Sequence, residues 1–173
     1  MDDYLLLGEM NTPCQLINSE LTLSPSPTPY HQLVSGNLYD LLKIQAKKND
    51  GIAFYAPVDL YIDNKNVFQP DLVYISSENK NIVTGRGIEG IPELVVEIIS
   101  PSNVFTDRNV KKEVYRKIGL KEFWLVDPGN KTLEIYLPNQ TNPDIPHLYL
   151  AEEGIVTSTI LTELKFDLKD IFQ

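Results

Sequence analysis

The chain contains one cysteine, two histidines and no long uninterrupted run of apolar residues. The lone Cys14 excludes an internal disulfide, and neither it nor His31 and His147 has the spacing of a zinc site. No segment approaches the roughly 18 consecutive apolar residues that a membrane-spanning helix needs. The first residues, MDDYLLLGEM, are acidic where a secretory signal is basic, so we expect a cytoplasmic protein with no membrane partner.

Basic residues are also scarce, because 15 lysines and arginines stand against 24 aspartates and glutamates, a net charge of −9. This balance argues against a protein that coats nucleic acid without specificity, since such binding is driven by release of counterions from phosphates. Nine of the basic residues are concentrated in two stretches, 43–48 and 107–121. They form either solvated helix faces or a patch that holds phosphates.

The length of 173 residues and the hydrophobic fraction of 42% suit a single domain over 1–173 with a sizeable core. Apolar periodicity and turn signals predict the order of its elements. These are a helix over 30–48, strands over 52–62 and 67–75 that form a hairpin, a strand over 94–100, a helix over 107–118, strands over 122–126 and 133–137, and further strands between 147 and 172. This order predicts an α/β fold with a mixed sheet.

Three local signals refine these elements. Pro70 cannot donate a hydrogen bond to a ladder, which favours an edge position or a bulge near Asp71. Thr106 is the expected N-cap of the second helix. Gly119 is the expected stop at the end of that helix.

The segment PELVVEIISPS places Glu97 in the middle of a nearly continuous apolar run, the pattern of a strand buried on both faces. Removing an ionised carboxylate from water costs several kcal/mol unless a partner, a metal or a proton compensates it. A compensating group must therefore lie near Glu97.

A second carboxylate can reach the same place. Asp71 stands 26 residues before Glu97, enough for the chain to leave one strand, cross a loop and return beside it. With the backbone carbonyl of Ile98, the two carboxylates would form an all-oxygen site suited to Mg²⁺ or Mn²⁺ rather than zinc. The charge of that metal would compensate Glu97.

The following helix supplies a cation. Asp107, Lys111 and Tyr115 are spaced i, i+4, i+8, so they share one helix face, which can turn back toward the end of the buried strand. A cation beside a metal suits phosphodiester hydrolysis, because negative charge builds on the phosphorus oxygens during attack by water. Tyr115 would support Lys111 or contact phosphate, and Asp107 is an accessory candidate.

Five segments in order resemble the Uma family of restriction endonucleases, a bacterial branch of the PD-(D/E)-x-K nuclease superfamily. They are QPDLVYI, PELVVEIISPSN, DRNVKKEVY, GLKEFWLVDP and LEIYL, and SELTLSPSPTPYHQLVSGNL extends the resemblance over most of the chain. It implies a restriction-endonuclease-like mixed β-sheet flanked by α-helices, with additional antiparallel strands, and a divalent-metal nuclease that acts on DNA. Asp71 would match the aspartate of PD, and Glu97 the acidic residue of the second motif.

One position departs from the superfamily pattern. The usual lysine lies two residues after the acid, where this chain has Ile99. In the Uma-type pattern the lysine lies on the next helix as K-x-x-x-Y, which Lys111 and Tyr115 match. Glu20 resembles the extra acidic residue that these nucleases often bring from the N-terminal region, and His31, which starts the first helix, is a further accessory candidate.

Three hypotheses follow. The first is the Mg²⁺- or Mn²⁺-dependent endonuclease, and the second is a nuclease fold kept as a binding or regulatory module, which the net charge favours. In the third, Glu97 is the buried partner of a lysine or arginine, and no metal is bound. This hypothesis would be supported by a structure in which Asp71 and Glu97 face apart, or in which each has its own basic partner. Cleavage of both strands of a duplex usually needs two active sites, so a homodimer stays open, although no residue identifies an interface.

Overall fold

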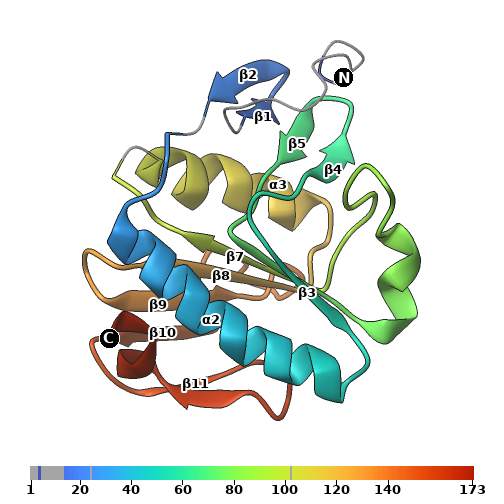
Figure 1. Ribbon diagram of the computed structural model, residues 1–173. Helices are drawn as coiled ribbons and strands as arrows, with labels where there is room; N and C mark the ends of the chain where they lie inside the picture. Colours follow the sequence, from blue (N-terminus) through green and yellow to red (C-terminus); the bar gives the residue numbers. More distant parts are fainter. Residues whose placement is uncertain (1–3, 5–13, 24, 102) are drawn as a thin grey trace.

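The computed structural model describes residues 4, 14–23, 25–101 and 103–173. Its centre is a six-stranded sheet in the order β10-β9-β8-β7-β6-β3, in which β7 and β8 are parallel and the other neighbours are antiparallel (Figure 1). A four-stranded sheet, β2-β1-β5-β4, lies at one end of it. The predicted α/β class, with a mixed sheet and flanking helices, is confirmed.

The helices and strands follow one another along the chain in a mixed order. They are β1 Cys14–Ile17, β2 Glu20–Leu23, α2 Pro29–Lys48, β3 Ile52–Tyr55, β4 Leu60–Asp63, β5 Asn66–Phe68, β6 Leu72–Ile75, the 3₁₀ helix η1 Ser77–Ile82, β7 Leu94–Ile98, the π-helical turn η2 Thr106–Lys111, α3 Lys112–Lys117, β8 Glu122–Asp127, β9 Thr132–Tyr136, β10 Leu148–Ala151, β11 Ile155–Thr157, β12 Lys165–Asp167 and the 3₁₀ helix η3 Leu168–Phe172. Among the described residues, no helix is long and apolar enough to cross a membrane.

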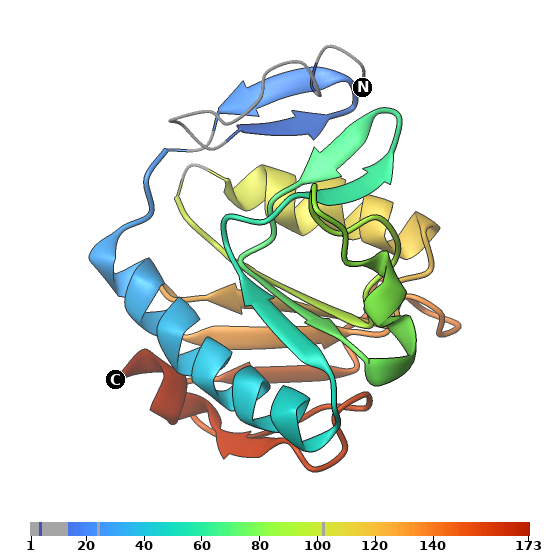
Figure 2. The same cartoon turned by 45° about the vertical axis from the view of Figure 1, so that its right-hand side comes forward.

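Helices cover both faces of the central sheet (Figure 2). On one face, α2 packs Val34, Leu38 and Leu42 against Val96 and other side chains of the sheet and the C-terminal segment. On the other face, Tyr115 of α3 packs with the neighbouring side chains of β6, β7 and β8. Because successive side chains of a strand point to opposite faces, burial on both faces explains why β7 is apolar almost throughout.

The first helix is close to its predicted range, since it begins at Pro29 and ends at Lys48. Thr28 is its N-cap and accepts a hydrogen bond from the backbone nitrogen of His31, while Pro29 occupies the first helical position, where no backbone donor is needed. This start of α2 holds His31 in place at the end of the central sheet.

The predicted hairpin is present but divided between two sheets. β3 pairs with β6 in the central sheet, whereas β4 pairs with β5 in the smaller one. The prediction of two unbroken strands is therefore wrong, because the chain bends at Pro57 on one side and at Pro70 on the other. Pro70 lies between β5 and the interior strand β6, so the expected edge position or bulge is wrong as well. The bend places Asp71 just before β6.

The second helix also differs from its expected form. Phe105 already has helical dihedral angles, and Thr106 lies inside the π-helical turn, so the prediction of Thr106 as N-cap is wrong. The helix ends at Lys117, and Gly119 follows its C-cap Ile118 as the expected stop, with a φ of 75° in the left-handed region that glycine adopts at low cost. A π-turn accommodates one residue more than an α-turn, and such turns are frequent at functional sites.

The C-terminal segment contains the predicted additional strands and ends in η3. Strand β10 extends the central sheet, and β11 pairs with β12 in a separate two-stranded sheet. Glu122, fully buried at the start of β8, connects this segment to the sheet because its carboxylate accepts hydrogen bonds from Ser158 Oγ at 2.7 Å and Thr159 N at 2.8 Å. Trp124 Nε1 donates to the same carboxylate at 2.6 Å.

Replacing Glu122 by glutamine should therefore destabilise the fold, because an amide nitrogen would face donors that require an acceptor. We expect Glu122→Gln to lower the free energy of unfolding by about 3 kcal/mol, measured by urea denaturation. The control is Glu163→Gln, at an exposed glutamate, which should change it by less than about 0.5 kcal/mol. Equal effects of the two substitutions would contradict this role of Glu122.

Candidate active site

The pairing of β6 with β7 brings two predicted carboxylates to one place. Leu72 pairs with Val96 in the antiparallel register, so Asp71, one residue earlier, is level with Glu97 on the same face. The Oδ2 atom of Asp71 accepts a hydrogen bond of 2.7 Å from the backbone nitrogen of Ile98. The bend at Pro70 and this hydrogen bond together hold Asp71 beside the end of β7.

Glu97 is 2% exposed and has two donors from the following helical segment. Lys111 Nζ lies 2.8 Å from Oε2, and the hydroxyl of Tyr115 donates to Oε1 at 2.7 Å. The expected shared helix face is thus directed at Glu97. In this structure the buried carboxylate is compensated by an ammonium group and a phenol.

Asp107 completes the buried ionic cluster. Its Oδ1 atom lies 3.2 Å from Lys111 Nζ, within ion-pair distance, although the angles do not make a hydrogen bond and this oxygen has no other partner among the described residues. Lys111 is 3% exposed and lies between the carboxylates of Glu97 and Asp107. An aspartate oxygen in this position retains capacity to accept a further donor or a cation.

His31 joins the cluster from α2. Its Nε2 atom lies 2.9 Å from the carbonyl oxygen of Ile98 and 3.4 Å from Oδ1 of Asp71. A ring nitrogen that carries hydrogen therefore points at the place where the Asp71 carboxylate and the Ile98 carbonyl converge. The other ring nitrogen, Nδ1, is buried without a hydrogen-bond partner among the described residues.

A cavity of about 310 Å³ opens beside these side chains. The ionisable residues that line it are His31, Asp71, Glu97, Asp107 and Lys111, and they are joined by Ile98, Pro57 and the Ser/Pro loop of residues 25–28. Four amide side chains also line it and were missed from the sequence, because isolated amides on a strand, on a helix or in a loop carry no distinguishing pattern; they are Gln15, Gln32, Gln69 and Asn103. The cations in the described lining, His31 and Lys111, each contact a carboxylate.

The proximity of these groups shifts their proton affinities. Burial raises the pKa of Glu97 to about 8; Lys111 opposes this shift, while Asp107 and Asp71 add to it. Burial likewise raises the pKa of Asp107 against the effect of Lys111. Because Lys111 lies between Glu97 and Asp107, the raised pKa values belong to the two interacting carboxyl groups together rather than to either residue alone.

The cationic and phenolic groups respond to the same carboxylates. Burial disfavours the charged form of Lys111, but Glu97 and Asp107 outweigh it and raise the pKa, so the ammonium stays charged. Burial also acts against the His31 cation, yet the hydrogen bond and charge of Asp71 raise its pKa. Burial and the neighbouring Glu97 raise the pKa of Tyr115, which keeps the phenol protonated as a donor.

The donor set fits a hard divalent cation in part. Asp71 Oδ1 and the carbonyl oxygen of Ile98 both face the Nε2–H group of His31. These two oxygens therefore already share a positively polarised partner, as they would share a cation. Both oxygens of Glu97, in contrast, are engaged by Lys111 and Tyr115. No group of three or more His, Cys, Asp or Glu side chains in the described parts of the chain is arranged to hold a metal.

Other predicted elements lie apart from the cavity. Glu20 is exposed at the start of β2 and does not line it. The six basic residues of the 107–121 stretch each form an ion pair with a carboxylate; these are Arg108, Lys111, Lys112, Arg116, Lys117 and Lys121. Every cation that this stretch could offer to a phosphate therefore already has a carboxylate partner.

The comparisons with known proteins agree with this fold. The sequence pattern of the Uma2 family, described as "Putative restriction endonuclease", matches residues 1–169. The chain belongs to the Uma2 family. The predicted family is thereby confirmed, and with it the assignment to a family described as restriction endonucleases.

Two individual proteins are similar to this Uma2 chain. An uncharacterized protein of Synechocystis sp. (strain PCC 6803) is 27% identical over 137 residues, which cover 78% of this chain and 77% of the relative. A crystal structure of "a putative nuclease belonging to DUF820" from Anabaena variabilis superposes with a TM-score of 0.79 at 20% identity, covering 99% of this chain and 96% of that one. At this identity the structural likeness shows the shared fold.

The raised pKa values predict how stability depends on pH. Because the pKa values of Glu97, Asp107 and His31 are raised in the folded protein, their contribution to stability is fully present below the unfolded pKa values. It is lost as pH rises through the folded values, so the free energy of unfolding should fall between about pH 5 and about pH 8. In Glu97→Gln this slope should be shallower by up to about 1.4 kcal/mol per pH unit.

Urea denaturation across this pH range measures both slopes. Glu163→Gln again provides the control, because it removes a carboxylate that is exposed. Parallel curves for the parent and Glu97→Gln would show that the buried cluster does not control the pH dependence.

Proposed function

We propose that this chain is a Mg²⁺- or Mn²⁺-dependent endonuclease that hydrolyses phosphodiester bonds of DNA. The observation that carries the proposal is the convergence of Asp71, Glu97 and Lys111 on one cavity, beside the Ile98 carbonyl. Membership of a family described as restriction endonucleases supports the reaction type. We further infer that 1–173 acts as one domain and that two copies act together on a duplex.

In this proposal Asp71, Glu97 and the Ile98 carbonyl hold the divalent metal, an all-oxygen set that suits Mg²⁺ or Mn²⁺. The metal would supply Lewis-acid stabilisation of the charge that develops on the phosphorus oxygens. Lys111 would add a fixed positive charge beside the same oxygens and orient the attacking water. Tyr115 would hold the Glu97 carboxylate, and Asp107 would hold Lys111, in the required positions.

In this proposal a metal shares or replaces existing hydrogen bonds. Each oxygen of Glu97 accepts one hydrogen and keeps a second lone pair, so a metal would use that lone pair or replace Lys111 or Tyr115. If Lys111 is replaced, Asp107 remains as its carboxylate partner. His31 contacts Asp71 and the Ile98 carbonyl, and a metal would share these two oxygens with it or replace it.

A binding or regulatory module is the second candidate function. It is favoured by the observation that each acid already has a basic neighbour, Lys111 for Glu97 and His31 for Asp71. This pairing is what a purely structural role of Glu97 requires, since a buried carboxylate with two donors needs no metal. The two candidates differ in whether the cluster exchanges these contacts for a divalent ion.

A cleavage assay tests the endonuclease. With Mn²⁺ or Mg²⁺, the parent should cleave DNA, and Asp71→Asn and Glu97→Gln should each reduce the rate by about a hundredfold or more, because each removes charge that stabilises the transition state. Substrates should include single-stranded and duplex DNA and RNA. Unaltered cleavage by Glu97→Gln would overturn the assignment.

Lys112→Met is the matched control for Lys111→Met. Both lysines are on the same helical segment, but Lys112 Nζ lies 3.8 Å from the ring centroid of Tyr136 and points away from Glu97. We expect about a hundredfold loss of kcat for Lys111→Met and less than about twofold for Lys112→Met. Losses of similar size would show that Lys111 has no special role.

Calorimetry distinguishes the endonuclease from the module without reference to activity. Titration of the parent with MnCl₂ or MgCl₂ should show binding with release of protons, because metal ligands must be deprotonated and the pKa of Glu97 is raised to about 8. Asp71→Asn should bind at least about tenfold more weakly. Absence of heat with both metals at millimolar concentration would favour the module.

A further inference from the structure

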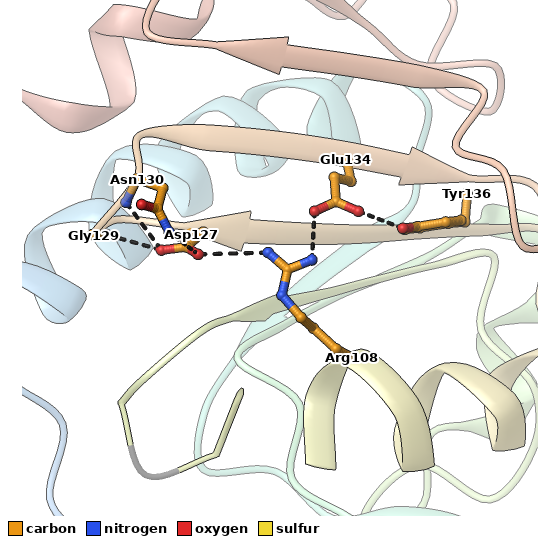
Figure 3. A network of polar contacts seen from close by, with 6 residues as sticks. All are labelled: Arg108, Asp127, Gly129, Asn130, Glu134 and Tyr136. Carbon is orange, nitrogen blue, oxygen red and sulfur yellow. Dashed lines mark hydrogen bonds and ion pairs between the residues drawn. The ribbon is translucent and has the colours of Figure 1, made fainter. Parts of the chain in front are cut away.

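Arg108 connects the helical segment of the candidate site to strands β8 and β9 of the central sheet. Its Nη1 atom lies 2.6 Å from Oε1 of Glu134 on β9, and its Nη2 atom lies 3.5 Å from Oδ2 of Asp127 at the end of β8 (Figure 3). The planar guanidinium thus joins two strands at once. A single arginine bound to two carboxylates is restrained in position and in rotation.

Both carboxylates are themselves held in place. The backbone nitrogens of Gly129 and Asn130 donate to Oδ1 of Asp127 at 3.0 and 3.1 Å, and Asn130 Nδ2 donates to Oδ2 at 2.9 Å. The hydroxyl of Tyr136 donates to Oε2 of Glu134 (Figure 3). The two carboxylates that accept from Arg108 are therefore held by hydrogen bonds within β9 and the β8–β9 turn.

Arg108 lies between the two site residues of the π-helical turn. Asp107 precedes it directly, and Lys111 ends the turn three residues later. Lys111 points to Glu97 and Asp107 contacts Lys111, whereas Arg108 points to β8 and β9. The same short segment thus faces the cavity on one side and the arginine contact on the other.

A π-turn needs such external support. It contains one residue more than an α-turn, so relaxation to α-helical geometry would rotate the following side chains by about 100° around the helix axis. Lys111 would then no longer point at Glu97. Arg108 is one-third exposed, but its partners Asp127 and Glu134 are largely buried, which strengthens the ionic contacts.

We propose that Arg108, through Asp127 and Glu134, is a positioning residue that fixes the π-helical turn so that Lys111 is directed at Glu97. This inference rests on the proposed function for its kinetic consequence, but its structural consequence can be measured without any activity. Arg108 does not line the cavity, so it acts through Lys111 rather than on substrate.

The test compares Arg108→Gln with Arg116→Gln. Arg116 is on α3 and also binds a carboxylate, since its Nε and Nη2 donate to Glu113 at 2.7 and 2.6 Å, but that contact lies within the helix. Both substitutions remove one arginine from the helical region 106–117; Arg108→Gln removes its ion pairs with Asp127 and Glu134, and Arg116→Gln removes its ion pair with Glu113. A general effect of lost charge would therefore appear in both variants.

The first readout is heteronuclear NMR of the lysine ammonium groups in the metal-free protein. Buried, ion-paired Lys111 should give a slowly exchanging ammonium signal, assigned by its loss in Lys111→Arg. We expect Arg108→Gln to shift this signal or abolish it through faster hydrogen exchange, and Arg116→Gln to leave it unchanged. An unchanged Lys111 signal in folded Arg108→Gln would overturn the proposal.

The second readout is the kinetics of metal-dependent cleavage. Arg108→Gln should lower kcat by about tenfold or more with KM for DNA within about twofold, because a displaced lysine weakens transition-state stabilisation rather than binding. Arg108→Lys, which can reach one carboxylate, should recover part of the loss. Full kcat in Arg108→Gln, or an equal loss in Arg116→Gln, would also overturn it.

Two outcomes separate this inference from the proposed function. If the parent cleaves no nucleic acid, the proposed function fails, while the ammonium signal still decides whether Arg108 positions Lys111. If Arg108→Gln does not fold, Glu134→Gln tests the same contact from the strand side, because it removes the 2.6 Å contact and leaves the arginine only Asp127 at 3.5 Å. An unchanged Lys111 signal in Glu134→Gln would then overturn the proposal.

Discussion

The buried carboxylate of Glu97 is the group on which the arrangement of the site depends. Water cannot solvate it, so the fold must supply donors, and it does so from one helical segment through Lys111 and Tyr115. That requirement ties η2 and α3 to β7 and keeps the segment against this face of the sheet. Asp107 then lies close enough to share Lys111, and Asp71 is level with Glu97 through strand pairing.

Several parts of this arrangement could be predicted from local pattern. Apolar periodicity located α2 and the central strands, and the i, i+4, i+8 spacing identified the helix face that meets Glu97. The bends at Pro57 and Pro70 were not predicted. The side-chain pattern of 52–62 and that of 67–75 are each typical of one unbroken strand, and neither pattern shows that the chain passes from one sheet to the other. The π-turn was also missed, since its extra residue is stabilised by Arg108, whose partners follow 19 and 26 residues later.

The charges of the chain show a similar contrast between sequence and structure. A run of basic residues beside a candidate nuclease site suggests contacts with phosphate, yet each of these cations has a carboxylate partner in the folded protein. With a net charge of −9, attraction of DNA cannot rest on an unpaired basic surface in this stretch. Association with DNA would then depend on charge brought by a bound metal and on exchange of existing ion pairs.

An acid within an apolar strand is by itself weak evidence for catalysis. Glu97, Glu122 and Glu134 all have this pattern, and each is compensated differently: by a lysine and a phenol, by neutral donors, and by Arg108 with Tyr136. Of these three, Glu97 alone lines the cavity and faces a second carboxylate in register, and its partner Lys111 also contacts Asp107, which lines the same cavity. What distinguishes a candidate metal ligand is thus an exchangeable set of partners next to open space, a property that burial and sequence pattern do not reveal.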